Sequence, residues 1–322
     1  DEFPEAPPPG DGAGDGAAAE PDEVARLLGI ATTATAGRVP PPATAAKAYV
    51  NLYTRETPAI ATVAGNFRIT APDAPSDVRH IVLDFGDQAF PVLEGQNIGV
   101  IPPGADAKGR PHTMRLYSIS SPRDGERPNH NNIALTVKRV AGEGARGVCS
   151  NFLCDLAKGD KVTVTGPFGD SFLMPNHSEA NIVMICTGTG SAPFRAFTER
   201  RRRHDADAGG KMILFFGART PGELPYFGPL MKLPSSLIDV NLAFSRVAGR
   251  PKEYVQDKMR ALAATLGELL ASATTFIYIC GLKGMEKGCE EALAEIGRER
   301  GLDWESVRAA MQRQGRYHVE TY

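Results

Sequence analysis

Between Tyr49 and about Pro175, hydrophobic residues occur in short runs that turn-forming residues separate. Alternation is clearest at 133–138, where Ile133, Leu135 and Val137 would share one face of a strand. The same pattern predicts strands at 66–70, 80–85, 97–101, 116–120, 133–140 and 161–165. Several short strands at this spacing favour an antiparallel β-barrel. A helix-length insert at 147–156 precedes the last of these strands.

From about Glu179 to the end, apolar strands alternate with helical patterns. The run 181–186 is apolar after its first residue, and a turn at 187–190 leads into a helix predicted at 193–203. Further strands are predicted at 212–217, 240–245, 276–281 and 317–322, and helices at 226–233, at 252–271, from 285 onward and at 304–313. Near-continuous apolar strands between helices are typical of an α/β doubly wound parallel sheet.

The first 48 residues follow neither pattern. They are rich in Ala, Pro and Gly and have no aromatic residue between Phe3 and Tyr49, so they cannot bury enough surface to offset chain entropy. A short helix at 23–28 is compatible with this composition. We therefore expect a disordered linker at 1–48, an antiparallel domain at 49–176 and a parallel-sheet domain at 177–322. Because a long linker opens the chain, we also expect another domain tethered before it, and the start at Asp1 without Met is compatible with a fragment or a processed form.

Composition excludes several classes of protein. The net charge of −2 argues against a dedicated nucleic-acid binder, and the basic run 200–203 is better explained as a solvated helix end than as a docking patch for an acidic partner. No apolar stretch is long enough to span a membrane, and no signal peptide is visible. The five scattered cysteines contain no Cys-x-x-Cys pair, so neither a zinc site nor an iron–sulfur cluster is expected, and a reducing cytoplasmic location is predicted.

Two strand ends in the parallel-sheet half are candidate binding edges, because such sheets bind ligands beyond the carboxyl ends of their strands. The glycine-rich turn at 187–190 precedes a helix start and could approach a pyrophosphate, although such turns also occur for packing alone. Ser245 and Arg246, with Lys252 and Tyr254 shortly after, suit a 2′-phosphate and an adenine face. On these residues alone, a solvated loop is the more common explanation.

Arg115, Tyr117 and Ser118 bring a cation, an aromatic ring and a hydroxyl to one predicted strand. These groups would suit a flavin, yet on spacing alone an ordinary half-buried strand is the more common explanation. Similarly, Cys280 ends a predicted strand and could touch a cofactor, but a cysteine there is more often a small buried hydrophobe. Tyr322 is the final residue, carried on an alternating segment that predicts an ordered strand.

Eight motifs in a fixed order change this balance. They are RLYSISS at 115–121, VKR at 137–139, GVCSNFLCDL at 147–156, GPFGDSFLMP at 166–175, CTGTGSAPFRAF at 186–197, FSR at 244–246 with KEY at 252–254, CGLKGMEKG at 280–288 and VETY at 319–322. The chain from about Tyr49 to Tyr322 therefore resembles the plant-type ferredoxin–NADP(+) reductase family. Within it, the segment 78–104 and the Ala/Pro-rich leader look most like the reductase component (component A) of benzoyl-CoA oxygenase, the 2,3-epoxidase, without its N-terminal iron–sulfur domain.

The resemblance implies roles for individual residues. FAD would be held by Arg115, Tyr117, Ser118, Lys138, Gly147, Val148, Cys149, Ser150 and Tyr322. NADP(H) would be held by Thr189, Gly190, Ser245, Arg246, Lys252 and Tyr254. The catalytic set would be Ser118, Cys280, Glu320 and Tyr322, with Tyr322 stacked on the flavin face that nicotinamide must occupy.

The implied activity is hydride transfer from NADPH to FAD, followed by single-electron delivery to an iron–sulfur carrier. The electrons would end at a di-iron oxygenase component that epoxidises benzoyl-CoA in aerobic benzoate degradation. The alternatives are a general ferredoxin or flavodoxin–NADP(+) reductase and a non-catalytic docking module with the same fold. Iron–sulfur clusters are expected only in an upstream domain. The loop 141–146 is shorter than in plastid enzymes and lacks their aromatic residue, which leaves the FAD adenine without an evident partner.

Overall fold

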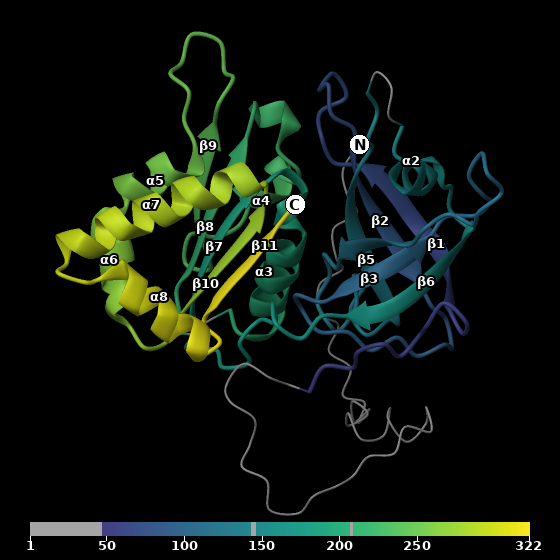
Figure 1. The fold of residues 1–322 in the computed structure, drawn as a ribbon, viewed down its shortest axis with the longest axis horizontal. Coiled ribbons are helices and arrows are strands. Elements are labelled where there is room, and N and C mark those ends of the chain that lie inside the picture. The colour runs from purple at the N-terminus through teal and green to yellow at the C-terminus, as the bar shows by residue number, and fades with distance from the viewer. Residues whose placement is uncertain (1–46, 143–145, 207–208) are drawn as a thin grey trace, which may run out of the picture. The chain divides into compact units, whose positions relative to one another are not determined.

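The computed structural model describes residues 47–142, 146–206 and 209–322 (Figure 1). The predicted linker at 1–48, including the short helix at 23–28, therefore lies almost wholly outside the described residues, as does the centre of the loop 141–146. Two sheets organise the described part, one antiparallel and one parallel. The structure therefore agrees with the predicted pairing of an antiparallel and a parallel-sheet half.

The antiparallel sheet has six strands in the order β4-β3-β6-β1-β2-β5. The strands are β1 (Ala59–Arg68), β2 (Val78–Asp84), β3 (Asn97–Ile101), β4 (Arg115–Ser118), β5 (Asn132–Lys138) and β6 (Lys161–Phe168). Just beyond β4, Ile119 bridges Leu135 of β5, and the Ser120 N–H donates to the Ala134 carbonyl at 2.8 Å. The two edges of the sheet thus meet at a bridge rather than along a continuous ladder, and a closed barrel stays a prediction.

The first strand begins earlier than the predicted 66–70. Strand β1 starts at Ala59 and buries Ala59, Ala61 and Val63 in the core. Alanine carries a weak strand signal, so this stretch does not stand out in the sequence. Its pairing with β2 shifts register between Val63 and Gly65, where the strand is irregular.

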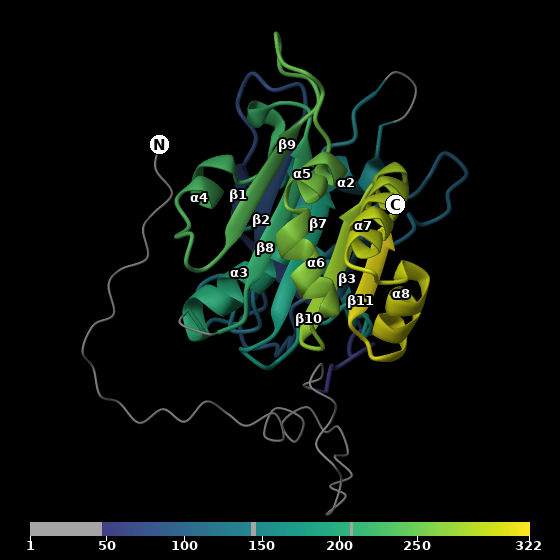
Figure 2. The ribbon, with the colours of Figure 1, turned by 90° about the vertical axis from the view of Figure 1, so that its left-hand side faces the viewer.

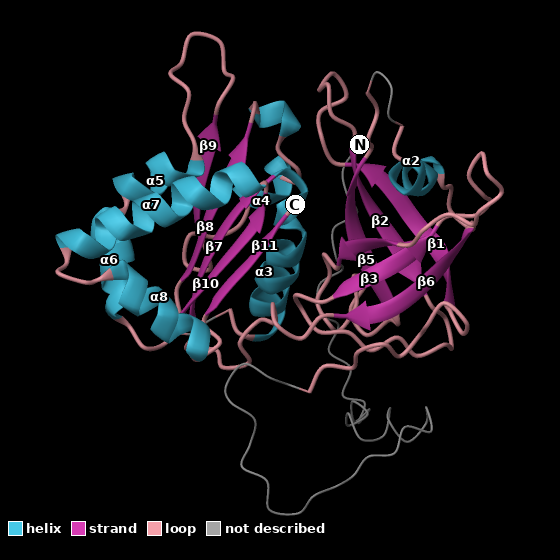
Figure 3. Cartoon of the chain, viewed as in Figure 1, coloured by secondary structure: helices cyan, strands magenta, loops and turns pink. Residues whose placement is uncertain are grey.

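The parallel sheet has five strands in the order β11-β10-β7-β8-β9, and every neighbouring pair is parallel. The strands are β7 (Asn181–Thr187), β8 (Met212–Ala218), β9 (Asp239–Phe244), β10 (Thr275–Gly281) and β11 (Tyr317–Thr321). The α-helices of this half are α3 (Ala192–His204), α4 (Phe227–Met231), α5 (Val255–Ala261), α6 (Ala263–Ala271), α7 (Lys283–Glu299) and α8 (Trp304–Arg313), and the remaining helix, α2 (Val148–Asp155), lies before β6 (Figure 3).

Helices cover both faces of the parallel sheet. One hydrophobic cluster joins the strands to α5, α6, α7 and α8, which Figure 2 shows in front of the sheet. A second cluster lies on the other face and includes Phe194 and Phe197 of α3. The helix predicted at 252–271 is interrupted at Leu262, whose φ of −107° and ψ of 26° leave the helical region. Among the described helices, none is long and apolar enough to cross a membrane.

The structure corrects the interpretation of the basic run at 200–203 as a mainly solvated helix end. Arg201 is only 2% exposed and donates to the carbonyls of Gly210 and Ala180. Arg203 donates to the carboxylate of Asp124 and to nearby carbonyl oxygens in the antiparallel half. Two of the four arginines are therefore used internally, to join strand ends and to join the two halves of the chain.

Candidate functional site

The order of the parallel sheet reverses at β7, and the carboxyl ends of β7 and β10 flank this switch point. The two backbones approach very closely there: a Cβ on Gly190 would lie 2.2 Å from the Cys280 carbonyl oxygen and 3.0 Å from the Gly281 Cα. Gly281 has a φ of 146° and lies directly beside Thr187. Glycine is needed at both positions because a side chain would fill this crevice.

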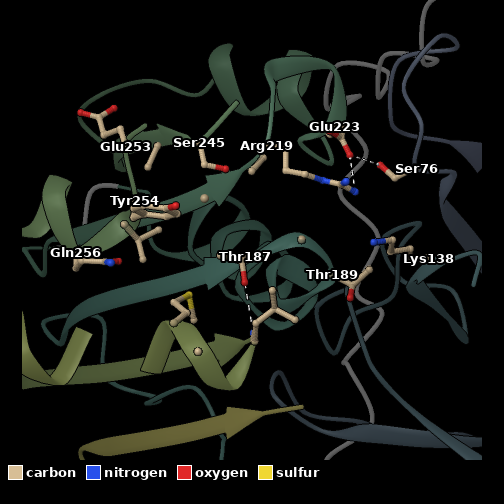
Figure 4. A pocket seen from close by; sticks show the side chains of 18 of the residues that line it. Ser76, Lys138, Thr187, Thr189, Arg219, Glu223, Ser245, Glu253, Tyr254 and Gln256 are labelled. Carbon is tan, nitrogen blue, oxygen red and sulfur yellow. Dashed lines mark hydrogen bonds and ion pairs between the residues drawn. The ribbon is translucent and has the colours of Figure 1, made fainter. Parts of the chain in front are cut away.

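Beyond this crevice lies a cavity of about 590 Å³ (Figure 4). Thr189, Ser245 and Tyr254, which the sequence predicts as coenzyme ligands, line it together with Thr187 and Gly188. Arg246 and Lys252 lie outside the lining formed by the described residues. The structure therefore brings part of the predicted nucleotide set around one space and leaves its two cations, Arg246 and Lys252, outside the lining.

The antiparallel half contributes one wall of this cavity through Ser76, Val78 and Lys138. The resemblance predicts Lys138 on FAD, and the structure places this residue in the lining of the cavity. An ammonium group in such a cavity would favour an anionic ligand. The site is thus built from both halves of the chain.

Sequence reasoning missed Arg219, which follows β8 and lines the cavity. Its Nη2 atom lies 2.9 Å from Oε2 of Glu223, and the Ser76 hydroxyl donates to the same oxygen at 3.3 Å (Figure 4). Glu223 is largely buried, with 8% of its side chain exposed. The position of Arg219 at the carboxyl end of a predicted strand was the signal that could have identified it.

The predicted catalytic residues Cys280 and Glu320 are direct neighbours across β10 and β11. Burial, with a contribution from Glu320, raises the pKa of the Cys280 thiol to about 12. Burial also raises the pKa of the Glu320 carboxyl, and a hydrogen bond with the Asn97 side chain lowers it in part. Cys280 is thus a small buried residue that also lies at the crevice, and its contact with a cofactor stays a prediction.

Asn97 connects this pair to the antiparallel half. It lies in β3 directly opposite Ser118 of β4, and its side chain reaches Glu320. Ser118 and Cys280 are 162 positions apart in the sequence, but only these two register pairs and one hydrogen bond separate them in the fold. Asn97 carried no sequence signal, because nothing local marks a residue whose partner is so distant.

Tyr322 lies over the crevice. Its backbone N–H donates to the Gly281 carbonyl at 2.9 Å, and its hydroxyl lies 2.8 Å from the Thr189 hydroxyl. The side chain nevertheless keeps 60% of its surface exposed. A ring held by these contacts and open to solvent could be displaced by a ligand without disrupting the core.

Tyr117 and Arg115 of the predicted flavin set lie close to the start of α2 in the antiparallel half. Tyr117 is partly buried, its hydroxyl contacts the Cys149 thiol, and burial raises its pKa well above the usual range. Arg115 lies close enough to lower the pKa of the Cys149 thiol, although burial raises that pKa overall. The Arg115 guanidinium is exposed and donates to the Thr113 hydroxyl at 2.6 Å. A cation, a ring and the first turn of α2 thus adjoin one surface.

The start of α2 fits a pyrophosphate. Gly147 is its N-cap, and within the described residues no side chain caps the first turn. A Cβ on Gly147 would lie 2.6 Å from the Ser150 hydroxyl and 2.9 Å from the Val140 side chain, so the backbone must stay bare here. Val148 is 51% exposed. Free N–H groups at a helix start favour an anion, which is the chemistry a dinucleotide requires.

Comparisons with known proteins agree with this geometry. The family described as "Oxidoreductase NAD-binding domain" matches residues 184–291. The chain is 37% identical over 287 residues to the cyanelle ferredoxin–NADP reductase of Cyanophora paradoxa, covering 85% of this chain and 79% of that protein. It is 39% identical to the chloroplastic leaf isozyme 1 of Arabidopsis thaliana, with the same coverage of both chains.

Among solved structures, the fold is similar to ferredoxin–NADP(+) reductase from Plasmodium falciparum with 2′P-AMP. The TM-score is 0.69 at 25% sequence identity, over 85% of this chain and 100% of that chain. The chain belongs to the ferredoxin–NADP reductase family and is an NADPH-dependent flavoprotein oxidoreductase that uses FAD and NADP(H).

Proposed function

We propose that this protein exchanges electrons between NADP(H) and a ferredoxin-type iron–sulfur carrier. The observation that carries the proposal is the link from Ser118 through Asn97 to Glu320 and Cys280, which joins the predicted flavin strand to the nicotinamide crevice. Bound FAD supplies the conversion between two-electron and one-electron chemistry. The protein supplies binding, orientation and a dry site.

On the flavin side, we assign Arg115 and the first turn of α2 to the pyrophosphate, and Tyr117 to the isoalloxazine ring. The exposed guanidinium and the uncapped helix start support this assignment. Ser118 is assigned to the reactive edge because it is the strand residue opposite Asn97. The FAD adenine has no evident partner in the short loop 141–146. The centre of this loop lies outside the described residues, so the environment of the adenine stays a prediction.

On the coenzyme side, we assign Thr189 and Gly190 to the nicotinamide and pyrophosphate. Burial raises the pKa of the Cys280 thiol to about 12 and also raises the pKa of the Glu320 carboxyl. The thiol therefore stays protonated at neutral pH, and the crevice does not present two anions to the ring. Tyr322 must leave its contact with Thr189 before nicotinamide can enter, which makes the C-terminal residue a gate.

We assign the 2′-phosphate and adenosine to Ser245, Arg246, Lys252 and Tyr254, and add Arg219 as a further cation. Ser245 and Tyr254 line the cavity, which supports the assignment. Replacing Arg246 and Lys252 together by glutamine should raise KM for NADPH far more than KM for NADH. Equal increases for the two coenzymes would refute the assignment of these cations.

The electron acceptor is proposed from the relatives, which are named ferredoxin–NADP reductases at 37–39% identity. A general reductase of this kind is the better supported proposal. Delivery to a di-iron oxygenase acting on benzoyl-CoA is the narrower proposal, which rests on the segment 78–104 and the leader alone. We also propose a domain boundary between residues 176 and 177, a closed barrel in the antiparallel half and a cytoplasmic location.

The test uses the full chain loaded with FAD. Addition of NADPH should bleach the visible flavin spectrum, and an artificial dye and a purified ferredoxin should each be reduced. Bleaching with dye reduction but no ferredoxin reduction would refute the carrier assignment alone. A colourless protein that does not bind FAD would refute the proposed function altogether. Stimulation by a purified benzoyl-CoA oxygenase component would support the narrower proposal, and its absence would count against it.

A further inference from the structure

A largely buried ionic cluster joins α3 of the parallel-sheet half to the loop after β4. Arg195 in the second turn of α3 donates through Nη1 and Nη2 to the two carboxylate oxygens of Glu126, at 2.7 and 2.8 Å. The same Nη1 atom donates to the Ser120 carbonyl at 2.8 Å. One guanidinium thus holds both a side chain and the backbone of the opposite half, with bidentate geometry.

His80 and Tyr226 complete this cluster. His80 is 4% exposed, with Nε2 3.2 Å from Glu126 Oε1 and Nδ1 2.9 Å from the Tyr226 hydroxyl. Because a carboxylate only accepts, Nε2–H must donate to Glu126, so Nδ1 accepts from Tyr226. The Thr136 hydroxyl then donates to the Tyr226 oxygen at 2.7 Å. Every member of this cluster therefore has a partner.

The charges of the cluster are fixed. Burial and the nearby Arg195 lower the pKa of His80, although Glu126 and Glu199 oppose this effect, so the ring stays neutral. Burial would raise the pKa of Glu126, but Arg195 and His80 hold it well below its usual range. The cation Arg195 also lies 5.2 Å from the centre of the Tyr226 ring. At neutral pH the cluster therefore pairs one cation, Arg195, with one anion, Glu126, and does not act as a pH switch.

Ser120 and Arg195, which this cluster joins, lie on the two sides of the proposed reaction site. Ser120 lies two residues after Ser118 on the flavin strand, and its N–H is fixed to β5 through Ala134. Arg195 lies four residues after Ser191, the last residue of the turn that carries Thr189 and Gly190. A change in the Arg195 contact would therefore move the nicotinamide turn relative to the flavin strand.

We propose that Arg195, held by Glu126 with His80 and Tyr226, is a positioning residue for hydride transfer, and this inference rests on the proposed function. It touches neither reacting ring in our assignment. It sets the separation between the Ser118 strand and the Gly190 turn. A misplacement of about 1 Å costs on the order of 100-fold in rate, so the effect should be on the chemical step rather than on coenzyme affinity.

The experiment compares wild type, Arg195→Gln, Arg195→Lys, Glu126→Gln and the double variant Arg195→Gln/Glu126→Gln, each as the FAD-loaded full chain. We expect Arg195→Gln to slow flavin reduction at saturating NADPH by about 100-fold, with the Kd for 2′-phospho-AMP and the FAD content unchanged. Arg195→Lys keeps the charge and should recover part of the rate. Because Arg195 and Glu126 form one contact, the double variant should be no slower than the slower single variant.

A readout independent of turnover is hydrogen–deuterium exchange of the apo chain, in which Arg195→Gln should speed exchange in both 115–122 and 188–195. Arg202→Gln is the matched control, because Arg202 lies on the same helix, is 46% exposed and pairs only with Glu199 among the described residues. It should change nothing.

An active wild type with an equally active Arg195→Gln variant would overturn the inference alone. So would a rate loss accompanied by equal loss of FAD or of 2′-phospho-AMP affinity, since that pattern indicates a merely structural role. A wild type that ignores NADPH would refute the proposed function and the inference together.

Discussion

Replacing Gly190 by alanine is the most direct test of the close backbone approach at the switch point. The backbone of Gly190 lies outside the left-handed region, so alanine is compatible with its conformation and only space opposes the substitution. The new Cβ would lie 2.2 Å from the Cys280 carbonyl oxygen and 2.6 Å from its carbonyl carbon. Both are backbone atoms, so no flexible side chain can yield. Reaching the 3.4 Å of an ordinary contact requires a separation of about 1.2 Å between the turn after β7 and the end of β10.

This displacement predicts two effects of Gly190→Ala. Overpacking should lower the free energy of unfolding by about 1–3 kcal/mol. Hydride transfer should slow on the order of 100-fold, because the turn would shift by about the distance that disrupts a reacting geometry. Binding of 2′-phospho-AMP should remain unchanged, since Ser245 and Tyr254 lie away from the crevice on other elements.

Stopped-flow reduction of the flavin at saturating NADPH measures the rate, and chemical denaturation measures the stability. Gly228→Ala is the matched control, because Gly228 lies in α4 with open space around its position for a Cβ. It should alter neither quantity appreciably. A Gly190→Ala variant with wild-type rate and wild-type stability would refute the close approach and the reasoning built on it.

Three further predictions concern the same site. Because burial raises the pKa of Glu320, ionisation of this carboxyl destabilises the folded state as pH rises. Glu320→Gln should therefore increase the free energy of unfolding at pH 8, and this gain should disappear at about pH 4. Chemical denaturation at both pH values measures the effect. Tyr322→Ser should tighten NADP⁺ binding in an equilibrium titration, since it frees Thr189, and unchanged affinity would count against the gate. Arg219→Gln should weaken NADP⁺ binding about tenfold, as expected for a lost charged hydrogen bond, whereas Glu223→Gln should strengthen it. Calorimetry that shows both variants changing NADP⁺ affinity in the same direction would contradict these opposite roles.

Local signals predicted most elements of this fold. Helix α8 and strand β3 have the bounds that the sequence predicts, although β3 buries Ile98, Gly99 and Val100 in succession rather than alternately. The early start of β1 was missed because its inward positions at Ala59 and Ala61 are small. The break at Leu262 was missed because residues on both sides of it favour helix.

The residue types at the strand ends can be read from the sequence: the glycine turn before α3, Cys280 at the end of β10, and the Arg115–Ser118 strand. Which of these residues meet depends on the packing of the folded chain. Parallel register set Cys280 beside Glu320, and the packing of one half on the other brought Asn97 to Glu320 and Arg195 to Ser120. Such contacts join residues far apart in the chain, so no local periodicity records them.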